Sequence, residues 1–378
     1  MTRFGAFYFV SFLNMGVYAP WLPPLLAFRG LTPTQIGWAL GLVSLWRALL
    51  PPLWGALADR LQQRHHLLAV VCLAAGLALL PLVGDSPPSI ILAALATYGV
   101  FVAPVLPLTE ALTLEALGTE RTGYGRVRLW GSLGFIAMSM GIGFVVVRFG
   151  LGTIAWALTL PLLACAVLAL GLVVPTNPRP HALAPHGKIN WKPLLPVLLV
   201  ATLVQISHGP YYAFFSLTLT KLGASAPVIG IFWALGVAIE IFLMAFAAPL
   251  TSRFSGLHLL QFGVTAAAVR WMVLANTDSL VLIGISQMLH AGSYASVHLA
   301  AIGMVDDVMP REHRALGQSL LSASAYGVGV GVGCSVAGRL VTPWGYAGIY
   351  QTASLTCLLA LAMSPWCHRA ALRKGASA

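Results

Sequence analysis

The chain has 378 residues, of which 58% are hydrophobic and only 8% are charged. A soluble domain carries about 25% charged residues, so this composition excludes an ordinary soluble protein and predicts that the bilayer is the solvent. The formal net charge of +11 comes from 21 basic and 10 acidic side chains. No arginine-rich tract or basic stripe accompanies it, so nucleic acid is not an expected partner.

The apolar residues form continuous, helix-length runs, unlike the alternating strands of a membrane β-barrel. Crossing the hydrocarbon core as helix takes about 20 apolar residues, so twelve spans use roughly 240 residues. Only short loops and tails remain, and we expect no separate soluble domain. The predicted spans, in chain order, are 4–27, 36–58, 67–84, 88–115, 124–147, 151–174, 193–219, 228–251, 258–276, 279–305, 315–340 and 345–367.

The basic residues predict the orientation in the membrane. An even number of spans places both termini on one side, and cytoplasmic loops carry the excess of Lys and Arg. With the N-terminus inside, fifteen basic residues fall in the inner loops and tails, and four fall outside. The outer four are Arg29, Arg148, Lys221 and Arg339. Both termini are therefore predicted to be cytoplasmic.

A proline-rich and basic segment, PTNPRPHALAPHGKINWK at 175–192, lies in the middle of the chain. We interpret it as a cytoplasmic linker between two halves of six helices each, residues 1–174 and 193–378. The five cysteines lie in apolar runs or at the end of one, without metal-like spacing, and we expect buried thiols.

The two halves are similar to each other at a nearly constant offset. The matching segments are MGVYAPW (15–21) with HGPYYAF (208–214), GALADR (55–60) with APLTSR (248–253), and ERTGYGR (120–126) with EHRALGQ (312–318). The first pair aligns Gly16 with Gly209 and Tyr18 with Tyr211. This pattern predicts an all-α membrane protein with twelve transmembrane helices in two pseudo-symmetric six-helix bundles. We expect a substrate site near the bilayer midplane between them.

The segment GALADRLQQR (55–64), at the inner end of the second predicted helix, resembles the helix 2–3 loop signature of the major facilitator superfamily. Gly55 permits a close helix approach, and Asp59 lies beside Arg60 and Arg64 in a charge cluster. In the family this cluster helps to lock the inner gate against helix 11, so the resemblance implies gate residues Gly55, Asp59 and Arg60. Two glutamines replace the usual glycine and basic residue at the motif's end, and an ordinary capped helix end is the alternative.

Longer segments resemble the lactose-permease branch of proton symporters: MGVYAPWLPPLL (15–26), TEALTLEALGTERTGYGRVRLWGSLGF (109–135), VRWM (269–272) and LHAG (289–292). Within that branch, three segments are most similar to the phenylpropionate permease group: PPLWGALADR (51–60), SHGPYYAFFS (207–216) and QMLHAGSYASVHLAA (287–301). The resemblance implies the major facilitator fold, a small-molecule substrate, no cofactor and a location in the bacterial inner membrane. We expect a monomer.

Charges inside the first half mark a pathway, because each costs at least ~2.5–3.5 kcal/mol on insertion scales and usually faces a cavity. Arg47 lies twelve residues before Asp59, roughly 18 Å deeper along the same helix, too far for its side chain to reach the membrane edge. Glu110 and Arg128 lie at comparable depth on adjacent helices and can form an ion pair. The resemblance implies substrate-binding charges at both positions. A structural ion pair is the alternative for all three.

Two charges lie deep in the second half. Glu240 and Arg270 match charged positions that matter for binding and coupling in the permease branch, and Arg270 is assigned to substrate binding. Glu240 is the only carboxylate within the membrane core of this half. It is therefore our first candidate for proton coupling.

Three histidines, His208, His290 and His298, also lie at membrane depth in the second half. We expect them to bind substrate within a titratable network, with His290 also a coupling candidate, although hydrogen-bonded core histidines are the alternative. They lack carboxylate or thiolate partners at ligand spacing, so no metal site is expected. Ser293 replaces the proton-carrying glutamate of lactose permease, which excludes that route.

The core charges favour an anionic substrate. Arg47, Arg128 and Arg270 oppose Glu110 and Glu240, which leaves one positive charge when all are ionised. Aromatic residues could form an apolar pocket suited to a ring, or could face lipid. They are Tyr18, Trp21, Tyr211, Tyr212, Phe214, Phe215 and Trp233, of which Tyr18 and Tyr211 are assigned to substrate binding.

The sequence thus predicts a proton-coupled symporter of a small anion, such as an aromatic carboxylate, working by alternating access. A proton-coupled sugar or nucleoside symporter is the alternative. If no residue carries the proton, the protein is expected to be a uniporter. A drug or metabolite exporter is disfavoured, because no proline occurs between Arg126 and Gly150 where antiporters of this superfamily have a glycine-proline run. No nucleophile–base–oxyanion set is present, so the protein is not expected to be an enzyme.

Overall fold

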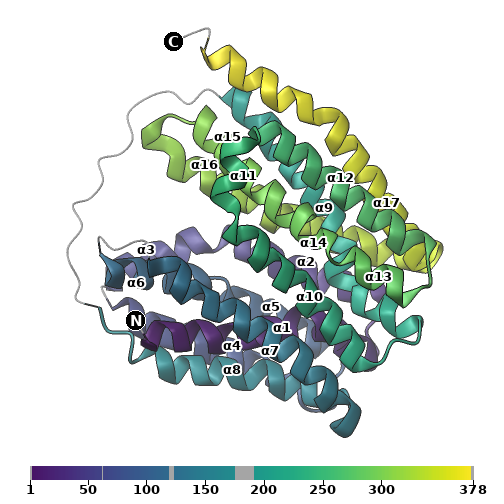
Figure 1. The fold of residues 1–378 in the computed structure, drawn as a ribbon. Coiled ribbons are helices and arrows are strands. Elements are labelled where there is room, and N and C mark those ends of the chain that lie inside the picture. Colours follow the sequence, from purple (N-terminus) through teal and green to yellow (C-terminus); the bar gives the residue numbers. More distant parts are fainter. Residues whose placement is uncertain (1, 62, 119–122, 175–190, 376–378) are drawn as a thin grey trace. The chain divides into compact units, whose positions relative to one another are not determined.

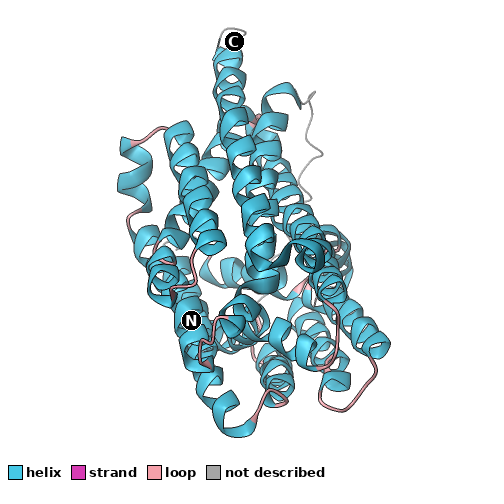
Figure 2. Ribbon diagram, turned by 90° about the vertical axis from the view of Figure 1, so that its right-hand side faces the viewer, coloured by secondary structure: helices cyan, strands magenta, loops and turns pink. Residues whose placement is uncertain are grey.

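The computed structural model of the chain describes residues 2–61, 63–118, 123–174 and 191–375 (Figure 1). These residues form helices joined by short loops, with no strand among them (Figure 2). The all-α prediction is therefore confirmed. Most of the predicted linker, residues 175–190, lies outside the described residues, and the helix that follows begins at Trp191.

The chain forms two compact units. The first contains Met1–Asn177 and Ala213–Ala234, and the second contains Pro178–Tyr212 and Leu235–Ala378. They follow the two predicted halves except for the segment Ala213–Ala234, which packs with the first unit.

The described residues of the first part of the chain form a series of α-helices with a 3-10 turn between two of them. They are α1 (Thr2–Phe28), α2 (Pro33–Leu49), α3 (Pro51–Leu61), α4 (Arg64–Ala78), the turn η1 (Leu80–Leu82), α5 (Pro88–Val102), α6 (Val105–Leu117), α7 (Tyr124–Phe149) and α8 (Thr153–Ala169). Two predicted spans are broken here. The span 36–58 bends by 47° between α2 and α3, at Pro51. In the span 88–115 the helix is interrupted only at Ala103 and Pro104, just before α6, and Pro88–Leu117 still counts as one candidate span. Proline lacks the N–H that continues a helix and clashes with the preceding turn.

The second part is more interrupted. Its elements are α9 (Trp191–Lys221), α10 (Ala226–Ala245), α11 (Ala247–Arg253), α12 (Gly256–Asn276), α13 (Leu280–Ser286), α14 (Leu289–Ala291), the π-helical segment η3 (Gly292–Ser296), α15 (Val297–Val308), the 3-10 turn η4 (Arg311–His313), α16 (Arg314–Leu321), the π-helical segment η5 (Ser322–Gly329) and α17 (Val330–Gly375). Gly345, with φ of 67°, divides α17 at a kink, which matches the predicted break between the last two spans.

Length and composition alone identify seven described helices that can cross a membrane, or nine when each bent pair counts as one span. This number is below twelve partly because Arg311–Cys367 counts once despite the kink at Gly345, and because the apolar helix α8 has only 17 residues.

Equivalent close approaches occur in the two repeats. A Cβ atom on Gly16 in α1 would lie 2.5 Å from the carbonyl oxygen of Phe135 in α7. A Cβ atom on Gly209 in α9 would overlap the backbone of Gly333 in α17. Only glycine permits two helices to approach this closely. The aligned glycines therefore perform the same packing role, which supports the predicted duplication.

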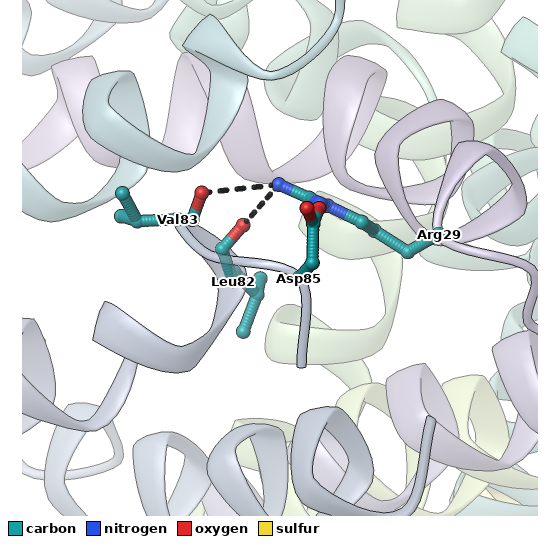
Figure 3. A network of polar contacts seen from close by, with 4 residues as sticks. All are labelled: Arg29, Leu82, Val83 and Asp85. Atoms are coloured by element: carbon teal, nitrogen blue, oxygen red, sulfur yellow. Dashed lines mark hydrogen bonds and ion pairs between the residues drawn. The ribbon is translucent and has the colours of Figure 1, made fainter. Parts of the chain in front are cut away.

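A polar network ties the end of α1 to the loop before α5 (Figure 3). The Arg29 guanidinium donates to the carbonyl oxygens of Leu82 and Val83 at 3.0 and 3.2 Å, and to Oδ1 of Asp85 at 2.6 Å. The Asp85 side chain is fully exposed, so its ion pair adds little, whereas the two carbonyls bind a largely buried guanidinium. Arg29 thus holds the end of η1 in place.

Candidate functional site

Arg47 lies in the last turn of α2, just before the bend at Pro51, and its side chain is half-buried. Its guanidinium lies 3.4 Å from the sulfur of Met15 and 5.1 Å from the centre of the Tyr18 ring. The described residues supply no carboxylate within 4 Å of it. The charge of Arg47 therefore has only uncharged described neighbours, and its side chain is partly accessible to solvent.

The Tyr18 ring beside Arg47 belongs to a small aromatic and polar cluster. Tyr18 stacks on Tyr98 with ring centres 5.8 Å apart. The Tyr98 hydroxyl donates to Asn14, whose amide donates to the carbonyl of Leu158 in α8. This chain of contacts fixes the ring pair relative to α1 and α8.

Glu110 and Arg128 both lie in the first unit but do not form the ion pair that the sequence allowed. The hydroxyl of Tyr124 donates to Oε1 of Glu110 at 3.0 Å. The Arg128 guanidinium lies over Phe12, 4.2 Å from the ring centre, and 5.8 Å from that of Tyr8. No ion pair joins the two charges within the described part of the chain.

The gate cluster differs from the prediction in its basic partner. Arg64 binds Oδ1 of Asp59 at 2.6 Å and Oε2 of Glu115 at 3.3 Å. Arg60 is exposed and forms no ion pair with any described residue. No atom of the first unit lies within 4 Å of a Cβ placed on Gly55, so the expected close helix approach is absent there.

The second unit encloses a guanidinium among neutral partners. Arg270 in α12 is fully buried and donates to Nδ1 of His290 at 3.0 Å and to Oε1 of Gln287 at 2.7 Å. Its charge lies over the Tyr211 ring, 4.1 Å from the centre. Among the described residues no carboxylate lies within 4 Å of Arg270.

His290 links this arginine to Glu240 in α10. Arginine is always a donor, so Nδ1 of His290 accepts and the ring proton sits on Nε2. Nε2 lies 3.9 Å from Oε2 of Glu240. Adding a proton to Nδ1 would place two donors against each other, so the hydrogen bond from Arg270 requires an unprotonated Nδ1.

His208 and His298 both lie near Tyr294 in the same unit, with ring centres 6.3 and 6.4 Å from that of Tyr294. His208 is fully buried, and its Nδ1 donates to the carbonyl of Val204 at 2.8 Å, as a core histidine does. His298 is half-buried, and its Nδ1 lies 2.6 Å from the hydroxyl of Tyr326. The Tyr294 ring stacks on both His290 and His298. Tyr294 and Tyr326 lie in the π-helical segments η3 and η5, a kind of helix frequent at functional sites.

Comparison with known proteins agrees with this architecture. The sequence profile of the MFS_1 like family matches residues 1–351. The chain belongs to the MFS_1 like family.

Two curated relatives align with nearly the whole chain. A probable 3-phenylpropionic acid transporter of Escherichia coli (strain K12) is 29% identical over 95% of both chains. The maltose permease of Geobacillus stearothermophilus is 27% identical over 95% of this chain and 92% of its own. Among solved structures, a mutant of the nucleoside transporter NupG superposes with a TM-score of 0.87 at 14% identity, covering 97% of this chain and 99% of that one. At 14% identity, the similarity to NupG shows the fold alone.

This MFS_1 like protein is therefore a secondary transporter with the all-α major facilitator fold, and it is not an enzyme. It takes a small-molecule substrate and is a multi-pass protein of the inner membrane. The described residues contain no group of three or more His, Cys, Asp or Glu side chains that could hold a metal.

Several aromatic residues of this transporter pack differently from the prediction. Phe214 and Phe215 are fully buried, and the indole of Trp233 donates to Ser216. The indole of Trp21 donates to the carbonyl of Ser139. These side chains face neither lipid nor solvent and form part of the core of the first unit.

Other contacting residues were missed from the sequence. Gln287 binds Arg270 and Tyr124 binds Glu110, and neither was singled out. The spacing of both residues from predicted site residues could have identified them. Gln287 lies three residues before His290 and Tyr124 four before Arg128, so each shares a helix face with a predicted site residue.

Proposed function

We propose that this transporter is a proton-coupled symporter of a small aromatic carboxylate, working by alternating access. The observation that supports it most is Arg47, a half-buried guanidinium whose described neighbours, the Met15 thioether, the Tyr18 ring and the Tyr98 side chain, are all uncharged. An arginine inside a membrane protein is costly unless an anion or another partner compensates it. A substrate carboxylate supplies that partner, with the bidentate geometry that guanidinium favours.

The ring specificity rests on what lies next to Arg47. A carboxylate bound there is followed, across its alkyl spacer, by an aryl group within reach of the Tyr18 ring, which stacks on the fully buried Tyr98. Offset and edge contacts between aromatic rings contribute about 0.5–1.5 kcal/mol beyond burial. The similarity to a probable 3-phenylpropionic acid transporter supports the same class.

The proton is carried by Glu240. Arg270 holds His290 with its Nε2 proton toward Glu240, so the imidazole stabilises the ionised carboxylate and does not carry the coupled proton itself.

The other predicted site residues take different roles. Arg270 and His208 are fully buried, and we assign them to positioning. Tyr211, with its ring against Arg270, positions that guanidinium, and His298 remains a substrate contact. Arg128, half-buried over Phe12, is proposed as a second anion contact.

The second candidate is a sugar symporter, favoured by 27% identity to a maltose permease over 95% of the chain. The two candidates differ in the need for a cation. The hydroxyl groups of a sugar can hydrogen-bond to carboxylate and amide side chains as well as to arginine, so a sugar site does not require a cation. Removing Arg47 therefore separates them.

In proteoliposomes, Arg47→Ala should lower uptake of 3-phenylpropionate at least tenfold, because charge-assisted hydrogen bonds contribute about 1.5–3 kcal/mol. Arg148→Ala is the matched control, since Arg148 is exposed at the end of α7. Accumulation of maltose by the unaltered protein, with full transport by Arg47→Ala, would favour the sugar symporter instead.

We further propose that both termini are cytoplasmic, that the cluster of Asp59, Arg64 and Glu115 belongs to the inner gate, and that the protein acts as a monomer. The gate assignment moves the basic partner from Arg60 to Arg64, which binds both carboxylates.

A further inference from the structure

Tyr124 and Arg128 lie on one face of α7, four residues apart, and Glu110 of α6 lies against that face. Side chains at this spacing are neighbours on a helix surface, so both can reach the same carboxylate. The carboxylate is bound by the phenol: the Tyr124 hydroxyl donates to Oε1 of Glu110 at 3.0 Å. Arg128, which carries the opposite charge, does not pair with it among the described residues.

Arg128 instead folds back over α1. Its guanidinium lies 4.2 Å from the centre of the Phe12 ring, and rings provide no oxygen acceptor for its N–H groups. A Cβ atom on Gly131 would lie 2.8 Å from a terminal nitrogen of Arg128 and 3.0 Å from the Phe12 ring. The absence of a side chain at Gly131 therefore makes room for this position of the guanidinium.

We infer that Tyr124 determines the charge selectivity of the transporter: by holding Glu110, it keeps Arg128 from being neutralised and leaves the guanidinium open to an anionic substrate. Tyr124 is a positioning residue in this account, because it acts on substrate only through Glu110 and Arg128. The inference rests on the proposed function, in which Arg128 contacts an anion.

The physical basis is a competition for one carboxylate. A phenol–carboxylate hydrogen bond leaves the two charges separate, whereas an ion pair would cancel them and reduce the desolvation cost of both. Without the Tyr124 hydroxyl, the strongest donor on this face of α7 is Arg128. A Glu110–Arg128 pair would then occupy the N–H groups that a substrate carboxylate needs.

The first test measures half-saturation of 3-phenylpropionate uptake in proteoliposomes. Tyr124→Phe should raise the half-saturation concentration about tenfold or more, the loss expected for one charge-assisted contact. Adding Glu110→Gln to Tyr124→Phe should return it to near the original value, because an amide does not neutralise Arg128. Gly131→Ala should also raise it, and should also be rescued by Glu110→Gln. A merely structural role of Tyr124 predicts no rescue, and that result would overturn the inference.

The second test does not depend on the substrate. The thermal midpoint in detergent is measured for Glu110→Gln, Arg128→Gln and their combination, first with Tyr124 present and then with Tyr124→Phe. The non-additive part of the shift in thermal midpoint measures the coupling between Glu110 and Arg128. It should be near zero when residue 124 is tyrosine and should appear when Tyr124→Phe is present. Equal coupling in both backgrounds would overturn the inference. If the unaltered protein transports no aryl carboxylate but the coupling appears only with phenylalanine, the proposed function fails and the role of Tyr124 in holding Glu110 stands.

Discussion

At the scale of single residues, exposure separates the predicted charges into two groups. Arg47 and Arg128 are half-buried and lie against rings, whereas Arg270 is fully enclosed by His290, Gln287 and Tyr211. A charge without access to solvent cannot meet a substrate in this conformation. The second group is therefore better suited to orienting a proton-binding carboxylate than to binding the solute.

Replacing Glu240 tests that assignment. Glu240→Gln should abolish accumulation driven by a pH gradient, because an amide neither binds nor releases the coupled proton, yet it should leave exchange of internal for external substrate intact. Accumulation and exchange are measured in the same proteoliposomes. Glu312→Gln, at an exposed carboxylate, is the control. Unchanged accumulation in Glu240→Gln would remove this residue from the coupling step.

The sequence predicted which side chains are charged and at what depth, but not their partners. Glu110 had two donors within reach, Tyr124 and Arg128, one helical turn apart on α7. The choice between them depends on side-chain rotamers and on the space left by Gly131, neither of which follows from spacing. For the same reason the sequence placed both Arg60 and Arg64 beside Asp59 but did not say which of the two pairs with it.

At the scale of elements, the positions of the spans were predictable and their internal breaks less so. Hydrophobic length placed each predicted span on one or more of the described helices, since burial of the backbone in lipid demands helix. The bend at Pro51 was foreseeable from proline chemistry, whereas the π-helical segments η3 and η5 contain no proline and no such sequence signal. Within α7, a close approach to another helix occurs at Gly134 but not at Gly141.

These two glycines provide a matched pair within one helix. A Cβ atom on Gly134 would overlap the carbonyl oxygen of Phe9 in α1, whereas nothing lies within 4 Å of one on Gly141. Gly134→Ala should destabilise the protein by about 1–3 kcal/mol through overpacking. Gly141→Ala should be neutral or slightly stabilising, because alanine favours helix. Thermal unfolding in detergent measures both, and equal effects would contradict the packing described for α1 and α7.

At the scale of the whole molecule, orientation in the membrane follows from charge alone and is open to direct test. All five cysteines are buried, so an introduced cysteine is the accessible one. Asp85→Cys, in a predicted outer loop, should react with a membrane-impermeant maleimide in intact cells. Gln63→Cys, in a predicted inner loop, should react only after permeabilisation. The reverse pattern would place the termini outside.

The central claim is that a proton gradient drives uptake of an aromatic carboxylate, and flux under an imposed gradient tests it most directly. Labelled 3-phenylpropionate is added to proteoliposomes with an acidic exterior and an alkaline lumen. Protonated acids cross lipid unaided, so the initial rate is compared with protein-free liposomes and with Glu240→Gln. The account predicts rapid protein-dependent accumulation that a protonophore abolishes and that Glu240→Gln lacks. Rates equal to those of protein-free liposomes, or the same protein-dependent rate with and without the gradient, would contradict it.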